Sequence, residues 1–119
     1  MFAFLDGDDI GSTLEILLLQ GELHKTTAFS ENINNALAEI KIFLKSQPNV
    51  KTHILGGDDI LIEYDQTVVE NSVIDELRSI FVKITGNRMS CGIGNDVNQA
   101  IWNLHKAKLL GKDRVYGGE

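Results

Sequence analysis

The chain has 119 residues, of which 43% are hydrophobic and only one is proline, a composition that indicates one globular domain and excludes a disordered chain. Its formal net charge of −6 argues against a broad phosphate-binding surface, so we expect no direct binding of DNA or RNA. The chain opens without a signal-peptide pattern, and no apolar run is long enough to span a bilayer. We therefore expect a cytoplasmic protein that does not insert into a membrane.

Apolar spacing predicts strands and helices in alternation. A short buried strand over Met1–Leu5 ends at an acidic turn, and a helix over Ile10–Leu19 follows, with Asp9 or Ser12 available as its N-terminal cap. The later elements are a long helix over Glu22–Ser46, a strand over Lys51–Leu55, a hairpin strand ending at Tyr64, a helix over Val68–Thr85, a strand over Arg88–Gly94, a helix over Val97–Leu110 and a short edge strand over Arg114–Tyr116.

This order predicts an α+β fold of the ferredoxin-like type, βαββαβ, with an additional C-terminal helix. We expect residues 1–119 to form this single domain. Cys91 is expected to be a small buried residue of a strand, and Trp102 is expected to pack the last helix on the sheet. Gly92 and Gly94 begin a pattern similar to a dinucleotide-binding motif, but Val97 occupies the third glycine position and excludes it.

Two acidic turns carry the main chemical signal. Asp6 follows the first strand, and Gly56-Gly57-Asp58-Asp59 separates two β-prone runs, as expected of a hairpin turn. A right-handed crossover makes the first two strands parallel, and the third strand fits between them. The two acidic turns should therefore lie side by side at one edge of the sheet.

Carboxylates that converge in this way repel one another, and a divalent cation would remove the repulsion. Asp6, Asp58 and Asp59 are predicted to be catalytic ligands of two Mg²⁺ or Mn²⁺ ions, roughly 3.5–4 Å apart as in two-metal phosphoryl transfer. A solvated turn is the alternative, because Asp and Gly are common turn residues. The EF-hand calcium pattern does not fit, because Ile10 and Leu17 occupy ligand positions.

Two features could bind the phosphates of a substrate. Free backbone N–H groups around Asp9, Ile10 and Gly11 lie at the start of a helix, where anions are favoured. Lys108 and Lys112 are four residues apart and would point the same way if the last helix continues that far. The alternative for the lysines is a favourable placement of cations near a helix C-terminus.

Asp6 after a first strand, the hairpin LGGDDILIEY and the ending AK-x-x-GK together resemble the palm-type nucleotide cyclases. These include the GGDEF diguanylate cyclases and the palm of the large subunit of type III CRISPR complexes. The compact length is most similar to the minimal CRISPR polymerase family. GGDEF enzymes have Glu-Phe where this chain has Asp59-Ile60, and the double aspartate resembles the CRISPR palms, which use ATP.

The resemblance implies a role for each position of the motif. Asp6, Asp58 and Asp59 would bind metal, with the carbonyl of Gly7 as an additional ligand. Gly57 would leave room for the nucleotide. The basic pair that binds the triphosphate would be Lys108 and Lys112.

The function implied by the resemblance is synthesis of a cyclic di- or oligoadenylate from ATP, with release of pyrophosphate, as a signal in anti-phage defence. One chain offers one nucleotide site, whereas closing a cyclic dinucleotide requires two phosphodiester bonds, so we expect a homodimer. The resemblance also implies a membrane effector that responds to the cyclic nucleotide. Two alternatives stay open: a non-catalytic palm that senses a nucleotide, and a nucleotide hydrolase similar to the GTP-opening cyclohydrolases.

Overall fold

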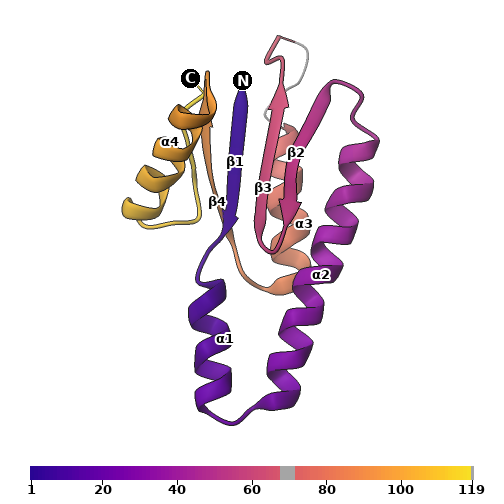
Figure 1. The fold of residues 1–119 in the computed structure, drawn as a ribbon, viewed down its shortest axis with the longest axis vertical. Helices are drawn as coiled ribbons and strands as arrows, with labels where there is room; N and C mark the ends of the chain where they lie inside the picture. Colours follow the sequence, from indigo (N-terminus) through magenta and orange to yellow (C-terminus); the bar gives the residue numbers. More distant parts are fainter. Residues whose placement is uncertain (68–71, 119) are drawn as a thin grey trace.

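A computed structural model describes residues 1–67 and 72–118 of the chain (Figure 1). The strands are β1 (Phe2–Gly7), β2 (Val50–Gly56), β3 (Asp59–Tyr64), β4 (Met89–Gly94) and β5 (Val115–Tyr116). The helices are α1 (Ile10–Leu19), α2 (Leu23–Lys45), α3 (Ser72–Thr85) and α4 (Val97–Leu109). This order confirms the predicted α+β fold of the ferredoxin-like type with an additional C-terminal helix. The predicted start of the third helix, at Val68, lies outside the described residues.

The strands form one sheet in the order β2-β3-β1-β4-β5. β3 is antiparallel to both β1 and β2, so β1 and β2 run parallel to each other with β3 between them, as predicted. β5 is parallel to β4 at the other edge of the sheet. Figure 1 shows the end of β1 beside the β2–β3 turn, at the end of the sheet from which α1 and α2 extend.

Helices cover both faces of the sheet. Leu5, Cys91 and Ile93 belong to one buried core cluster with apolar residues of α2 and α3. Because successive residues of a strand face opposite sides of the sheet, the residues next to Cys91 and Ile93 face the other side. These neighbours, Gly92 and Gly94, lie against α4. The sheet is therefore a middle layer between α2 and α3 on one face and α4 on the other.

Gly92 and Gly94 have a packing role in place of the excluded dinucleotide motif. A Cβ atom on Gly92 would lie 2.0 Å from the backbone nitrogen of Leu104, and one on Gly94 would lie 2.6 Å from that of Ala100. Such distances are sterically impossible, so only glycine permits this approach of α4 to β4. The close approach determines where the C-terminal end of α4 lies relative to β1.

The predicted packing of Trp102 is wrong. Its side chain is 65% exposed, because α4 faces the sheet through the small and apolar residues Ala100, Leu104 and Ala107, whose spacing places Trp102 on the other side of the helix. Cys91 is buried in β4, as predicted. Within residues 1–67 and 72–118, no helix combines the length and the apolar character required to cross a bilayer.

Candidate active site

Three carboxylates meet where β1 ends beside the β2–β3 turn. The strand register places Asp6 directly opposite Asp59, and the N–H of Gly7 donates a hydrogen bond to the carbonyl of Asp58 at 3.2 Å. One carboxylate oxygen from each of Asp6, Asp58 and Asp59 lies within 4.8 Å of the others. The structure therefore brings together the three residues that the sequence predicted to be neighbours.

The cluster is electrostatically unfavourable when it binds no metal ion. Burial, a hydrogen bond with Asp6 and the negative charge of Asp6 raise the pKa of both Asp58 and Asp59 to about 6. Like charges directly opposite each other on neighbouring strands destabilise a sheet. A divalent ion would offset this repulsion, and a set of carboxylate oxygens is the donor chemistry that Mg²⁺ and Mn²⁺ prefer. The donor set therefore fits such an ion.

Two glycines shape the cluster in different ways. A Cβ atom on Gly7 would lie 2.6 Å from Cγ1 of Ile10 and 3.1 Å from Oδ2 of Asp58, so the absence of a side chain lets the two turns approach. Gly57 has φ +59, and a Cβ atom there would meet nothing within 4 Å. The left-handed backbone requires glycine in the tight turn, and the space beside it is open.

Lys108 extends from the last turn of α4 to the carboxylates. Its Nζ lies 2.8 Å from Oδ1 of Asp8, 3.3 Å from Oδ2 of Asp6 and 3.0 Å from the carbonyl oxygen of Gly7. Burial lowers the pKa of the Lys108 ammonium, but the hydrogen bond with Asp8 and the charges of Asp6 and Asp8 outweigh it, so the net pKa is raised. Lys108 is therefore a charged group that contacts two of the predicted metal ligands.

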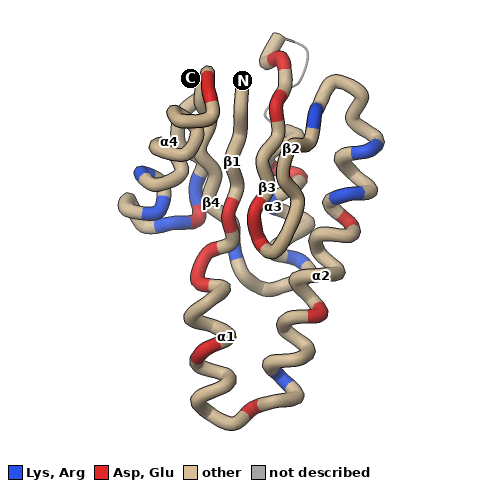
Figure 2. Tube along the Cα trace, viewed as in Figure 1, with Lys and Arg blue, Asp and Glu red and all other residues tan. Residues whose placement is uncertain are grey.

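Lys112 reaches the same edge by a different geometry from the one predicted. α4 ends at Leu109, and Lys112 itself has φ 65, so the two lysines do not share a helical face. Lys112 nevertheless forms an ion pair with Asp9, next to the Lys108 contacts. Figure 2 shows the acidic ends of β1 and of the hairpin beside the basic end of α4.

The start of α1 differs from the predicted cap. Asp9 occupies the N-cap position with φ 61, but its side chain makes no capping hydrogen bond. Instead its carbonyl accepts from the hydroxyls of Ser12 and Thr13. Asp9 is therefore at the predicted N-cap position but does not cap the helix through its side chain. The alternative prediction, Ser12, is wrong, because this residue lies inside the helix. Ile10 is buried, so this residue could contact a substrate only through its backbone, whereas Gly11 is exposed.

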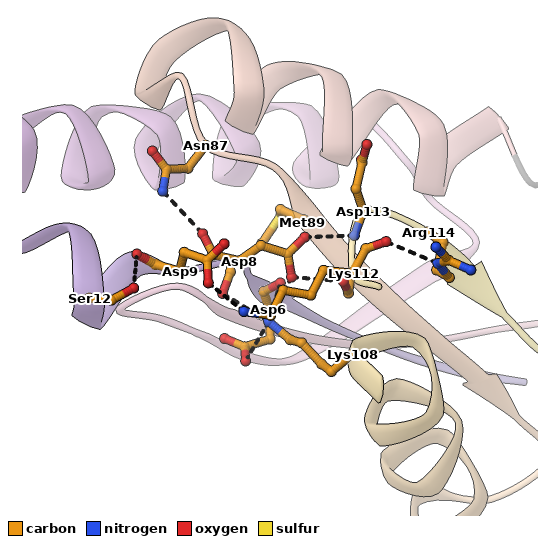
Figure 3. A network of polar contacts seen from close by, with 12 residues as sticks. Asp6, Asp8, Asp9, Ser12, Asn87, Met89, Lys108, Lys112, Asp113 and Arg114 are labelled. Carbon is orange, nitrogen blue, oxygen red and sulfur yellow. Dashed lines mark hydrogen bonds and ion pairs between the residues drawn. The ribbon is translucent and has the colours of Figure 1, made fainter. Parts of the chain in front are cut away.

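Sequence reasoning did not identify Asp8, which is the most connected residue of the site (Figure 3). The Asp8 side chain accepts hydrogen bonds from Oγ of Ser90 at 2.7 Å, from Nζ of Lys108 at 2.8 Å and from the N–H of Asp113 at 2.9 Å. Its carbonyl accepts from the side chain of Asn87 at 3.0 Å. Its position two residues after Asp6 was a possible signal, but the partners come from distant parts of the chain.

Comparison with known protein families assigns this chain to one of them. The profile of the minimal CRISPR polymerase domain, mCpol, matches residues 2–117. No curated protein matched the sequence. The profile covers nearly the whole chain, including the acidic turns and both lysines, and it indicates a nucleotidyltransferase-like palm of the kind that generally uses divalent metal ions. The chain therefore belongs to the minimal CRISPR polymerase domain family.

Proposed function

We propose that this protein is a metal-dependent nucleotidyltransferase that converts ATP into a cyclic di- or oligoadenylate and releases pyrophosphate, as a signal in anti-phage defence. The main support is the convergence of Asp6, Asp58 and Asp59 within 4.8 Å, with Lys108 directly beside them. Family membership supports a palm that acts on nucleotides. Metal binding would also explain why the protein keeps three carboxylates that repel one another.

In this proposal Asp6, Asp58 and Asp59 hold the Mg²⁺ or Mn²⁺ ions, and the carbonyl of Gly7 is a further oxygen ligand. Two such ions, when bound, lower the pKa of an attacking hydroxyl and neutralise charge on the departing pyrophosphate. Asp6 and Asp59 lie at the ends of strands and face each other in the sheet register, and Asp58 lies in the adjoining β2–β3 turn. The open space beside Gly57 would admit the nucleotide.

Phosphate binding falls to the cations and N–H groups next to the cluster. Lys108 and Lys112 lie beside it, and the backbone at Asp9, Ile10 and Gly11 is at the start of α1, where N–H groups have no partner within the helix. Each lysine pairs with an aspartate in the free protein. Binding of a triphosphate would therefore redirect some of these ammonium N–H bonds to phosphate oxygens, for Lys108 the one that now contacts Asp6.

The reaction also requires partners. One chain supplies one nucleotide site, so closing a ring from two nucleotides requires a homodimer that presents two sites to each other. We place this enzyme in the cytoplasm, and we propose a membrane effector that responds to the cyclic nucleotide as the downstream partner.

The test is to incubate the purified protein with ATP and either Mg²⁺ or Mn²⁺ and to identify the products by mass spectrometry. GTP is tested separately. An Asp58→Asn variant removes one carboxylate of the cluster, and a Glu31→Gln variant is the matched control, because it removes an exposed carboxylate of α2. We expect a cyclic adenylate from the wild type and from Glu31→Gln, and none from Asp58→Asn.

Other products would contradict the proposal in recognisable ways. A nucleotide product without a new phosphodiester bond would indicate a hydrolase. Nucleotide binding without turnover in either metal would indicate a sensing module. A cyclic adenylate made equally well by Asp58→Asn would show that the acidic cluster is not the site of the reaction.

A further inference from the structure

Asp8 is a charged side chain that is only 5% exposed. Burial of a carboxylate is costly unless charged or hydrogen-bonding groups compensate it. Here protein groups compensate the charge: Oδ1 accepts from Ser90 and Lys108, and Oδ2 accepts from the N–H of Asp113. Asp8 is not among the carboxylates that converge as a cluster. The Asp8 carboxylate therefore binds other groups of the protein. Its role depends on the roles of those groups.

Both lysines of the site depend on this carboxylate. Oδ1 of Asp8 holds the ammonium of Lys108 directly. Oδ2 holds the backbone of Asp113, the residue that follows Lys112. Lys112 and Asp113 have φ 65 and φ 48, a left-handed conformation that residues other than glycine adopt rarely. A turn of this kind requires contacts from the surrounding structure to maintain it.

The other side of the turn is held by arginines. The Asp113 carboxylate forms ion pairs with Arg78 of α3 at 2.9 Å and with Arg88 at 3.4 Å. The turn is therefore bound through its backbone by Asp8 and through its side chain by two arginines. Figure 3 shows Asp8 between Lys108 and the Lys112–Asp113 turn.

The position of Lys108 also matters for the metal ligands. Its ammonium already contacts Oδ2 of Asp6 and the carbonyl of Gly7, both of which the proposed function assigns to the metal ions. Without Asp8, the present contacts that remain to the ammonium would be those two oxygens and the carbonyl of Asp6 at 3.5 Å. Asp8 provides an alternative anchor from which Lys108 can release the metal ligands without leaving the site.

We propose that Asp8 is a positioning residue that holds Lys108 and the Lys112 turn in place to bind the triphosphate of the nucleotide substrate. This inference rests on the proposed function. It assigns to Asp8 an effect on nucleotide affinity that acts through the lysines, with no direct contact to substrate or metal.

The experiment uses Asp8→Asn, which preserves the size of the side chain but removes its charge and one of its acceptor oxygens. Binding of a non-hydrolysable ATP analogue with Mg²⁺ is measured by calorimetry, and KM and kcat for ATP are measured in parallel. We expect the Kd and KM to rise about tenfold or more, because a hydrogen bond to a charged group is lost, while kcat changes less.

Asn103→Ala is the matched control. Asn103 is also a buried polar residue, it lies on the same helix as Lys108, and its side chain donates to the carbonyl of Ile93 at 2.6 Å, away from the acidic cluster. We expect this variant to lose stability but to retain nucleotide affinity. A general loss of packing would instead weaken nucleotide binding in both variants.

A double-mutant cycle with Lys108→Met tests whether Asp8 acts through the lysine. In the Lys108→Met background, Asp8→Asn should weaken nucleotide binding less than it does in the wild type, because only the part that acts through the Lys112 turn remains. An equal loss in both backgrounds would overturn the inference, and so would an unchanged nucleotide affinity in folded Asp8→Asn. If the wild type itself binds no nucleotide, the proposed function fails together with this inference. Failure of the inference alone differs, because the wild type then still binds the nucleotide.

A second measurement does not require the variant to fold. In the wild type, the amide of Asp113 should be protected from hydrogen exchange both with and without the nucleotide, because Oδ2 of Asp8 accepts its N–H in both states. Loss of that protection on nucleotide binding would show that Asp8 releases the turn, and would overturn the inference.

Discussion

Replacing Asp58 by asparagine tests the electrostatics of the acidic cluster through stability alone. Asparagine keeps the shape of the side chain and removes its charge. Burial, the hydrogen bond with Asp6 and the charges of Asp6 and Asp59 raise the pKa of Asp58 from 3.8 to about 6. A carboxylate whose pKa is raised by folding destabilises the folded protein wherever it is ionised, and this penalty disappears as the pH falls through 6 towards 4.

The size of the penalty follows from the shift. A rise in pKa from 3.8 to about 6 corresponds to about 3 kcal/mol if it is transmitted in full. Asp58 is only partly buried, and solvent screening reduces the figure to roughly 1 kcal/mol. We therefore expect Asp58→Asn to be more stable than the wild type by that amount at about pH 7.5 without metal, and we expect the difference to vanish near pH 4.

The assay is urea denaturation in the presence of EDTA, at several pH values between these limits. Glu31→Gln is the control for a general effect of charge removal, because Glu31 is exposed on α2. Added Mg²⁺ or Mn²⁺ should stabilise the wild type more than Asp58→Asn, because ion binding favours the folded state. A variant that is less stable than the wild type at about pH 7.5, or a difference that does not change with pH, would refute the reasoning.

Three further substitutions test the surroundings of the cluster. Lys108→Met should tighten Mn²⁺ binding about tenfold, because it removes a cation that contacts Asp6 and Gly7, and should weaken nucleotide binding. Titration followed by electron paramagnetic resonance measures the metal affinity, and weaker Mn²⁺ binding would contradict this prediction. Gly92→Ala should displace α4 or prevent folding, because the new Cβ would lie 2.0 Å from the nitrogen of Leu104. Circular dichroism and thermal melting would show this, and a melting temperature equal to that of the wild type would contradict the assigned packing. Trp102→Ala should change the free energy of unfolding by less than about 0.5 kcal/mol, because the side chain is 65% exposed. A loss of several kcal/mol in urea denaturation would show that the ring is buried against another surface.

The fold was predictable because its signals are local. The apolar residues of α2, including Phe29, Ile33 and Ile40, recur at helical spacing and are buried in the structure. Glycine and aspartate mark the turn between β2 and β3. Once the element order is known, the right-handed crossover leaves few arrangements of the strands. The meeting of the two acidic turns follows from that arrangement, without knowledge of any side-chain contact.

The errors share a cause, which is dependence on contacts between distant residues. Gly92 and Gly94 admit the backbone of α4 at close range. The prediction for Trp102 was wrong because the face of α4 that they meet is that of Ala100 and Leu104. The geometry of Lys112 depends on a left-handed turn after the helix, and nothing in local helix propensity predicts that turn. Asp9 was predicted to cap α1 with its side chain, but its carboxylate instead binds Lys112, more than a hundred residues later in the chain.

The sequence by itself determined the order of elements, the sheet topology and the meeting of Asp6 with Asp58 and Asp59, because hydrophobic periodicity and turn chemistry act over short stretches of chain. Only the tertiary structure decided that Asp8 is buried and that it binds Lys108. A buried carboxylate can hold other groups in place only when donors from distant parts of the chain bind to it. Here those donors come from β4, α4 and the turn after α4. Their approach depends on the packing of α4 against the glycines of β4.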